Sequence, residues 1–212
     1  GRCPDGSFIA VNVFAYDALD SQLWGGLTST FRNRETKSRL VKARLDQAEH
    51  SMLMSTIAQR AGVSTRSVQS LWETDRNDVL VVSDGYGETL ADVSMTTDVA
   101  RGMWRLINAL HEAGIIHSEL SREAISISNN GELAFNDLRS AYISEANSGR
   151  ILDNVNVLAL TAASVSVDTA ISIAREFLSD DQLLEMAPYL QKAALSSSSS
   201  ASKELNAKKL RE

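Results

Sequence analysis

The sequence of 212 residues is 43% hydrophobic and 23% charged, which is typical of a globular protein with one large or two small domains. Its net charge of −6 argues against a surface that binds nucleic acid over the whole domain. The single cysteine, Cys3, excludes an internal disulfide, and it shows no metal-ligand spacing with the three histidines. No apolar run reaches the length of a membrane-spanning helix, which is about 18 residues.

The first half of the chain predicts strands around one helix. Residues 7–14 follow a Pro-Asp-Gly turn and are rich in apolar and β-branched residues, as strands are. A longer segment has apolar residues near helical spacing and ends at Gly62, a common helix stop. The expected elements are a strand at 7–14, a short helical or irregular segment at 19–27, a basic solvated segment at 32–44, a helix at 45–61, strands at 68–72 and 79–82, and a connector at 84–87.

The second half predicts mostly helices with one hairpin. The hairpin would turn at Asn129-Asn130-Gly131, and the first helix is clearly amphipathic. The expected elements are helices at 98–113, 151–163, 167–177 and 181–195, hairpin strands at 125–127 and 133–135, a serine linker at 196–200 and a charged helix at 203–212. This order predicts a two-lobed α+β fold. The expected units are an N-terminal lobe at 1–86, a helical C-terminal lobe at 87–195 and a tail at 196–212.

The segment 106–141 has the layout of a kinase catalytic loop with altered catalytic residues. A helix end with the pattern L-H-x-x-G-I-x-H leads into His117-Ser-Glu-Leu-Ser-Arg-Glu-Ala, where an active kinase has H-R-D-L-x-x-x-N. A short hairpin and Asp137-Leu-Arg follow, in the place of the D-F-G motif. The pattern predicts kinase ancestry more firmly than kinase activity.

Several phrases in order along the chain carry a wider resemblance. They are IAQRAGV at 57–63, DVLVVSDGYGETL at 78–90, LHEAGIIHSEL at 110–120, NNGELAFNDLRSA at 129–141 and APYLQKAALS at 187–196. The region from Phe8 to Leu195 resembles a protein-kinase-like fold. More closely, it resembles the kinase-like domain of some actinobacterial membrane proteins of the lysylphosphatidylglycerol synthase or flippase type.

The resemblance implies a role for each matching position. The strand lysine is replaced by Asn12, the catalytic Asp by Glu119 and the second metal-binding Asn by Ala124, while Asp137 keeps the first magnesium position. The Gly-rich loop is expected upstream of the chain's start. His117 and Asn154 are expected to be structural, with Asn154 bracing the catalytic loop. A shift of about 1 Å in a catalytic group can cost on the order of 100-fold in rate, so Glu119 is a weak replacement.

We therefore expect a pseudokinase domain without enzymatic activity, which regulates or scaffolds. No cofactor is expected, neither ATP nor magnesium, although Asp137 is the candidate metal ligand. By the resemblance and the abrupt chain ends, the domain would be a fragment of a larger membrane protein of lipid or cell-envelope traffic. It would be cytoplasmic and membrane-tethered, and would contact a protein partner or its parent transmembrane segment, and the membrane surface, but no nucleic acid.

Two alternatives remain open from the sequence. A divergent small-molecule phosphotransferase could use Glu119 and Asp137. Residues 56–72 also match a helix-turn-helix motif, in which Gly62 would make the turn and the following helix would enter the DNA major groove. A strand at 68–72 would exclude this DNA-binding interpretation.

Overall fold

The computed structural model describes residues 9–14, 44–74, 79–85, 87–128 and 130–190. The predictions for 19–27, the basic segment before Arg44, most of the turn at 74–78, the serine linker at 196–200 and the charged tail lie outside these residues. The first half contains β1 (Ile9–Phe14), α2 (Arg44–Arg60), β2 (Val68–Glu73), β3 (Val79–Asp84), β4 (Glu88–Thr89) and the 3₁₀ helix η1 (Leu90–Asp92). The second half contains α3 (Thr97–Glu112), β5 (Ile115–Ile116), β6 (Ile125–Ile127), β7 (Leu133–Phe135), β8 (Tyr142–Ile143), α4 (Asn147–Ser164), α5 (Val167–Ala174), α6 (Asp180–Met186) and η2 (Ala187–Tyr189).

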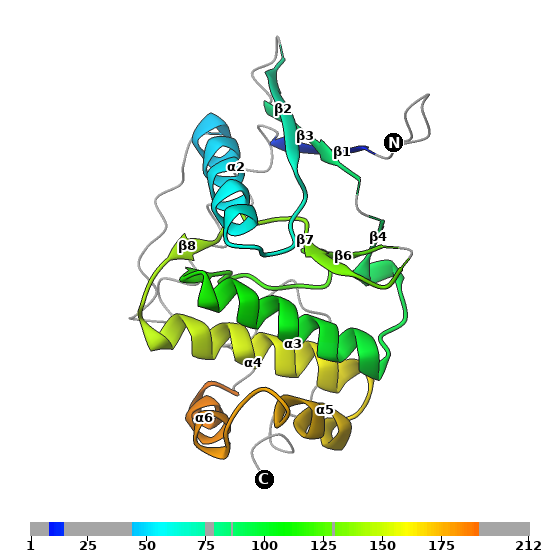
Figure 1. Cartoon of the computed structure of the whole chain (residues 1–212), viewed down its shortest axis with the longest axis vertical. Helices are drawn as coiled ribbons and strands as arrows, with labels where there is room; N and C mark the ends of the chain where they lie inside the picture. Colours follow the sequence, from blue (N-terminus) through cyan, green and yellow to red (C-terminus); the bar gives the residue numbers. More distant parts are fainter. Residues whose placement is uncertain (1–8, 15–43, 75–78, 86, 129, 191–212) are drawn as a thin grey trace.

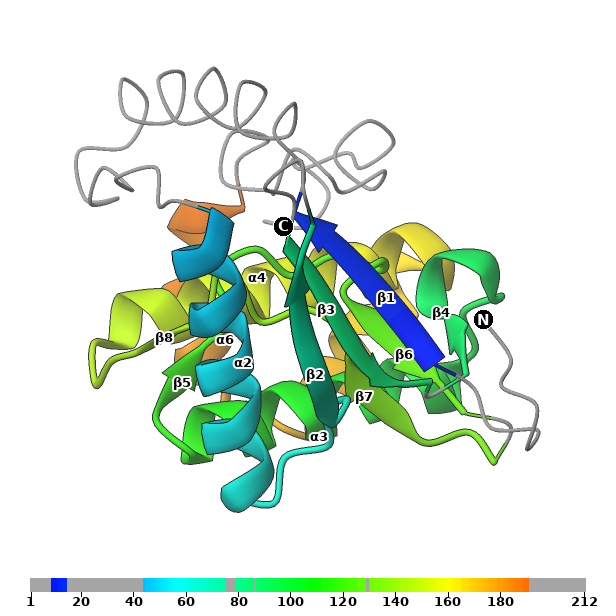
Figure 2. The same cartoon turned by 90° about the horizontal axis from the view of Figure 1, so that it is seen from above.

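Strands β1, β3 and β2 form an antiparallel sheet in that order, and α2 packs against one face of it (Figures 1 and 2). Alternate residues of β3 point to this face, because side chains of a strand alternate between the two faces. Val79 and Val81 are buried there against Ala48 of α2. Asn12 of β1 is the register partner of Val81, so it lies on the same face of the sheet.

Helices α3 and α4 lie side by side below the sheet, and α5 and α6 cover their far side (Figure 1). The side chain of Thr96 caps α3 by accepting a hydrogen bond from the Val99 amide at 3.3 Å. Trp104 of α3 is fully buried and stacks on Phe177, with 6.2 Å between ring centroids. This helical core supports the β6–β7 hairpin, which carries part of the candidate site at its ends.

The structure confirms the predicted α+β fold, with a small strand-rich part and a mainly helical part. The hairpin is confirmed, since Ile125 pairs with Phe135 and Ile127 with Leu133. The helix-turn-helix interpretation of 56–72 is wrong, because Val68–Glu73 is a strand of the sheet and leaves no second helix.

Two further predictions from the sequence concern helices, and the structure can be compared with both. The predicted helix at 181–195 is shorter than expected: α6 ends at Met186 and Pro188 lies in the 3₁₀ turn that follows. Proline lacks an amide donor and ends regular helices. Among the described residues, no helix is both long and apolar enough to cross a membrane. The boundary between lobes at 86 and 87 stays a prediction.

Candidate active site

The loop that follows β5 is hydrogen-bonded to the carboxylate of Asp153 in α4. Asp153 is completely buried, and its two oxygens accept hydrogen bonds from the amides of His117 and Ser118, each at 2.8 Å. One of these oxygens lies 3.0 Å from Nε2 of the buried His111. A carboxylate only accepts hydrogen bonds, so we assign the proton to this ring nitrogen. Asp153 therefore joins α3, α4 and the start of the loop.

Ser118 shows why the loop needs this support. Its φ of 71° lies in the left-handed region, which costs a residue with a side chain on the order of 1–3 kcal/mol. The hydrogen bond from its amide to Asp153 holds this conformation and directs the next residue, Glu119, to the surface. The sequence analysis assigned this bracing role to Asn154. The structure assigns it to the preceding residue, because the amides of His117 and Ser118 donate to Asp153.

The two retained carboxylates, Glu119 and Asp137, are both contacted by the residues that follow Asp137. An oxygen of Glu119 accepts a hydrogen bond from the Ser140 hydroxyl at 2.6 Å. Asp137 accepts one from the Arg139 amide at 3.0 Å and another from Nε of the same arginine at 2.6 Å. The short segment 139–140 thus connects the two carboxylates of one candidate site.

On the hairpin side of the site, Ala124 stands where the kinase pattern has its second metal ligand. Ala124 is buried and offers only its backbone carbonyl, which accepts from the Asn136 amide at 2.8 Å. The side chain of Asn136 accepts from the Ser126 hydroxyl and donates to the Glu123 carbonyl at 3.2 Å. Within the described part of the chain, no three His, Cys, Asp or Glu side chains are grouped to hold a metal ion. The residues present do not fit the two-magnesium site of the kinase pattern.

Asn12 comes from the sheet rather than from the loops. It lies on the face that α2 covers, as the kinase pattern requires of its position, but it is uncharged. Among the described residues, no hydrogen bond or ion pair joins Asn12 to Glu119 or Asp137. Glu119 and Asp137 are thus connected through the adjacent residues Ser140 and Arg139, and Ala124 bonds the amide of the residue before Asp137. Asn12 makes no hydrogen bond or ion pair with either carboxylate in the described part of the chain.

A polar contact that the sequence did not predict fixes the sheet to the hairpin. Arg66 donates to the Ser126 hydroxyl at 2.7 Å, and its amide donates to the Phe135 carbonyl at 3.1 Å. On α2, Nε2 of His50 lies 2.7 Å from the Ala141 carbonyl, just after the Asp137 segment. Burial lowers the pKa of the Arg66 guanidinium from its ordinary value. These contacts relate the strand-rich part to the loops, and only long-range pairing information could have found them.

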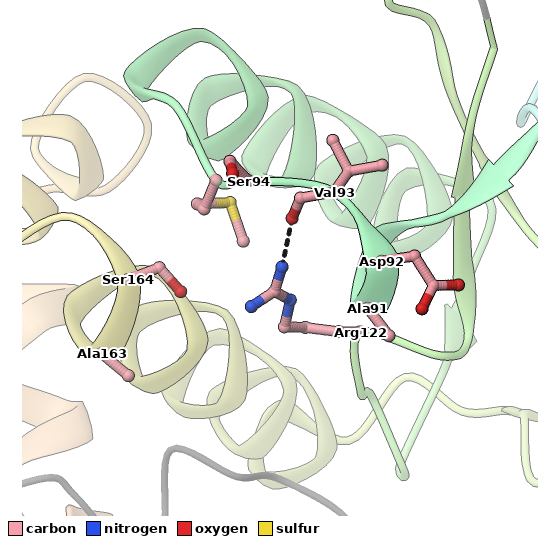
Figure 3. Close-up of a pocket in the computed structure, with 8 residues that line it drawn as sticks. Ala91, Asp92, Val93, Ser94, Arg122, Ala163 and Ser164 are labelled. Atoms are coloured by element: carbon pink, nitrogen blue, oxygen red, sulfur yellow. Dashed lines mark hydrogen bonds between the residues drawn. The ribbon is translucent and has the colours of Figure 1, made fainter.

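A surface pocket is lined by the segment after β4, by Arg122 and by the end of α4 (Figure 3), and neither Glu119 nor Asp137 lines it. Its volume is about 420 Å³, and Arg122 projects between the segment after β4 and the end of α4. Arg122 donates to the carbonyls of Leu90, at 2.7 Å, and of Val93. The arginine thereby joins the loop after β5 to this segment, which is a structural role.

The buried His117 should make stability depend on pH. Burial lowers the pKa of its imidazole from the ordinary 6.5, while the carboxylates of Asp153, Asp137 and Glu119 act in the opposite direction. The unfolded chain therefore takes up a proton at a higher pH than the folded chain does. We expect the free energy of unfolding to fall as the pH drops below about 6.5, where the unfolded histidine becomes charged.

Urea unfolding of the wild type and of His117→Gln, from about pH 7 to about pH 5, checks this prediction. Glutamine does not titrate in this range, so the variant should lose part of the pH-dependent decrease whatever its stability at pH 7. If the free energy of unfolding decreased equally with pH in both proteins, His117 would not be the cause of the pH dependence.

The chain is similar to known proteins over part of its length. No family model matches the chain. A curated relative, "Probable serine/threonine-protein kinase BUD32 homolog" of Archaeoglobus fulgidus, is 36% identical over 86 residues, which are 41% of this chain and 42% of the relative. The chain thus matches less than half of that protein. A solved structure, the bifunctional kinase-methyltransferase WbdD, has a TM-score of 0.44 at 13% identity over 66% of this chain and 37% of that one.

The match to the curated relative corrects one expectation from the sequence. The prediction that the chain is not an enzyme is contradicted, because the curated relative is named as a kinase. The narrower resemblance to lysylphosphatidylglycerol synthase or flippase proteins is not shown. The strand order β1-β3-β2 with α2, the loop after β5 and the β6–β7 hairpin, together with the match to this relative, show a protein-kinase-like fold.

Proposed function

We propose that this chain carries a divergent phosphotransferase domain of the kinase type. It would transfer the terminal phosphoryl group of a nucleoside triphosphate to a hydroxyl acceptor. The observation that carries the proposal is the Glu119 carboxylate, which is exposed, sits on a loop fixed by Asp153 and already accepts a hydrogen bond from a serine hydroxyl at 2.6 Å. The kinase name of the curated relative supports the same reaction type.

The chemistry that Glu119 can perform is that of a general base. The acceptor oxygen forms a bond to the terminal phosphorus while the bond from this phosphorus to its bridging oxygen breaks, and the nucleoside diphosphate leaves. The acceptor hydroxyl takes the place of the Ser140 hydroxyl beside Glu119. Its proton passes to the Glu119 carboxylate. Glutamate is one methylene longer than aspartate, and Asn12 supplies no positive charge, so we expect slow transfer.

The proposal is tested by transfer of labelled phosphate from γ-labelled ATP, with the 212-residue chain as enzyme. Casein and the chain itself serve as acceptors that contain serine and threonine hydroxyls, and glycerol serves as a small-molecule acceptor. We expect transfer to at least one of them, and a decrease of about 100-fold in Glu119→Gln, since general-base catalysis contributes on the order of 10²–10⁴-fold.

The matched control is Glu123→Gln, which removes another exposed carboxylate from the same loop. Its side chain has no place in the proposed chemistry, so transfer should stay within about twofold of the wild type. No transfer above a heat-denatured sample, or equal loss in the two variants, would overturn the proposal.

A further inference from the structure

The guanidinium of Arg122 is bonded only to neutral groups. Nε and Nη2 donate to the carbonyl of Leu90, at 3.1 and 2.7 Å, and Nη2 also donates to the carbonyl of Val93. Within the part of the chain that the structure describes, Arg122 forms no ion pair, and its Nη1 has no hydrogen-bond partner. A guanidinium is charged at every physiological pH. Its charge and the two N–H groups of Nη1 are therefore left for a ligand.

The guanidinium faces the pocket of about 420 Å³ between the segment after β4 and the end of α4. Figure 3 shows that it points into the pocket, toward Ser94 and Ser164, whereas the Asp92 side chain points away from it. The volume lies within the range of small-molecule sites, which is about 300–1,000 Å³. The pocket thus has room for a small molecule beside an uncompensated cation.

Further hydrogen-bond donors belong to the same pocket lining. The hydroxyl of the exposed Ser94 and the amides of Ser94 and Met95 bond to none of the residues that the structure describes. The Ser164 hydroxyl differs, because it donates to the Leu160 carbonyl at 2.9 Å. The donors without a partner thus come from the loop after β5 and from the segment after β4. A phosphate group has three strong acceptor oxygens and suits such a set better than a carboxylate, which has two.

We propose that this pocket binds the phosphate group of a small phosphate monoester, at a site separate from Glu119 and Asp137. Nη1 of Arg122 donates to the phosphate, in the charge-assisted hydrogen bond that arginine forms with this group. The bonds of Nε and Nη2 to the two backbone carbonyls fix the guanidinium in advance, so binding immobilises little additional side chain. The site does not depend on the proposed phosphoryl transfer.

An amide-detected NMR titration of the 212-residue chain with glycerol phosphate tests the proposal. Inorganic phosphate and acetate are titrated in parallel at constant ionic strength. We expect saturable shifts of the Ser94 and Met95 amide signals and of the Arg122 side-chain signal. Glycerol phosphate should bind more tightly than inorganic phosphate, because the pocket also holds its alcohol part. Acetate should bind at least about tenfold more weakly than glycerol phosphate, because it offers fewer acceptor oxygens and less charge.

Two variants and a matched control locate the site. Arg122→Gln should abolish the shifts, but it also alters the bonds to the backbone carbonyls. Ser94→Asp keeps the test valid if that variant does not fold, since it places a negative charge in the pocket by replacing an exposed side chain. It should weaken glycerol phosphate binding by at least about tenfold, because like charges repel. Ser148→Asp makes the same charge change at the other end of α4 and should stay within about twofold of the wild type.

Four results would overturn the proposal: no saturable shifts around the pocket, acetate binding equal to glycerol phosphate binding, tighter binding of inorganic phosphate than of the ester, or equal weakening in Ser94→Asp and Ser148→Asp. This proposal and the proposed function can fail separately, because the titration contains no nucleotide. Binding in the pocket without phosphate transfer would contradict only the proposed function, and transfer without binding in the pocket would contradict only this proposal.

Discussion

Replacing Asp153 with alanine should lower the free energy of unfolding by about 3–5 kcal/mol, the usual result of removing one partner from a buried charged interaction. Asp153 is fully buried and accepts hydrogen bonds from the amides of His117 and Ser118 and from the His111 ring. Without it, these donors lose their acceptor in a site closed to water. The left-handed conformation of Ser118 also loses its support.

Urea unfolding followed by circular dichroism measures this loss, and Asn154→Ala is the matched control. Asn154 is the neighbouring buried residue in α4, and its side-chain oxygen has no hydrogen-bond partner among the described residues. We expect about 1 kcal/mol or less for this change, near the average for point mutations. If Asn154→Ala destabilised the chain as much as Asp153→Ala, the bracing role would not belong to Asp153.

Replacing Gly87 with alanine should cost roughly 3 kcal/mol and disturb the pairing of β4 with β6. Gly87 has a φ of +129°, which residues with a side chain rarely adopt. An added Cβ would lie 2.1 Å from the Ile127 carbonyl oxygen, a backbone atom of β6. Glu88 pairs with this same Ile127, so the backbone must move to relieve the overlap. Urea unfolding gives the cost.

Gly131→Ala separates the steric overlap from the backbone preference. Gly131 also has a positive φ, of 85°, but no described atom lies within 4 Å of its added Cβ. This variant should cost only about 1–2 kcal/mol, which is the penalty for a left-handed residue with a side chain. Equal costs for the two variants would show that contact with Ile127 does not determine the effect.

Elements with a strong local signal could be predicted from the sequence. Helix α3 has apolar residues on one face from Val99 to Leu110, and its bounds of Thr97–Glu112 differ by one residue from the prediction. The hairpin at 125–135 combines alternating strands with an Asn-Gly turn signal, and its pairing is confirmed. The kinase layout of the loop was visible because its helix end and spacing survive, even though its chemistry has changed.

The contacts inside the site could not be predicted in the same way. Every residue of α4 from Asp153 to Ala162 is buried, so periodicity does not show whether Asp153 or Asn154 faces the loop. The pairing of Arg139 with Asp137 and of Ser140 with Glu119 depends on how the segment turns back. The prediction that the chain is not an enzyme relied on the number of altered catalytic positions. It is contradicted by the match to a relative that is named as a kinase.

The predictions of a protein partner, membrane contact and a cytoplasmic, membrane-tethered location stay predictions. They rest on the narrower resemblance and on segments outside the described residues. The proposal on catalysis does not depend on them, because it is argued from the contacts of Glu119 with Ser140 and of Asp153 with the loop.

The central claim is that Glu119 and Asp137 act as one phosphoryl-transfer site, and a double-mutant comparison tests it most directly. Rates of phosphate transfer from γ-labelled ATP are measured for the wild type, Glu119→Gln, Asp137→Asn and the double variant. Catalytic groups that act as a unit have strongly non-additive effects. We predict that the double variant is no more than about threefold slower than the slower single variant. Fully multiplied losses, or no loss in either single variant, would contradict the account.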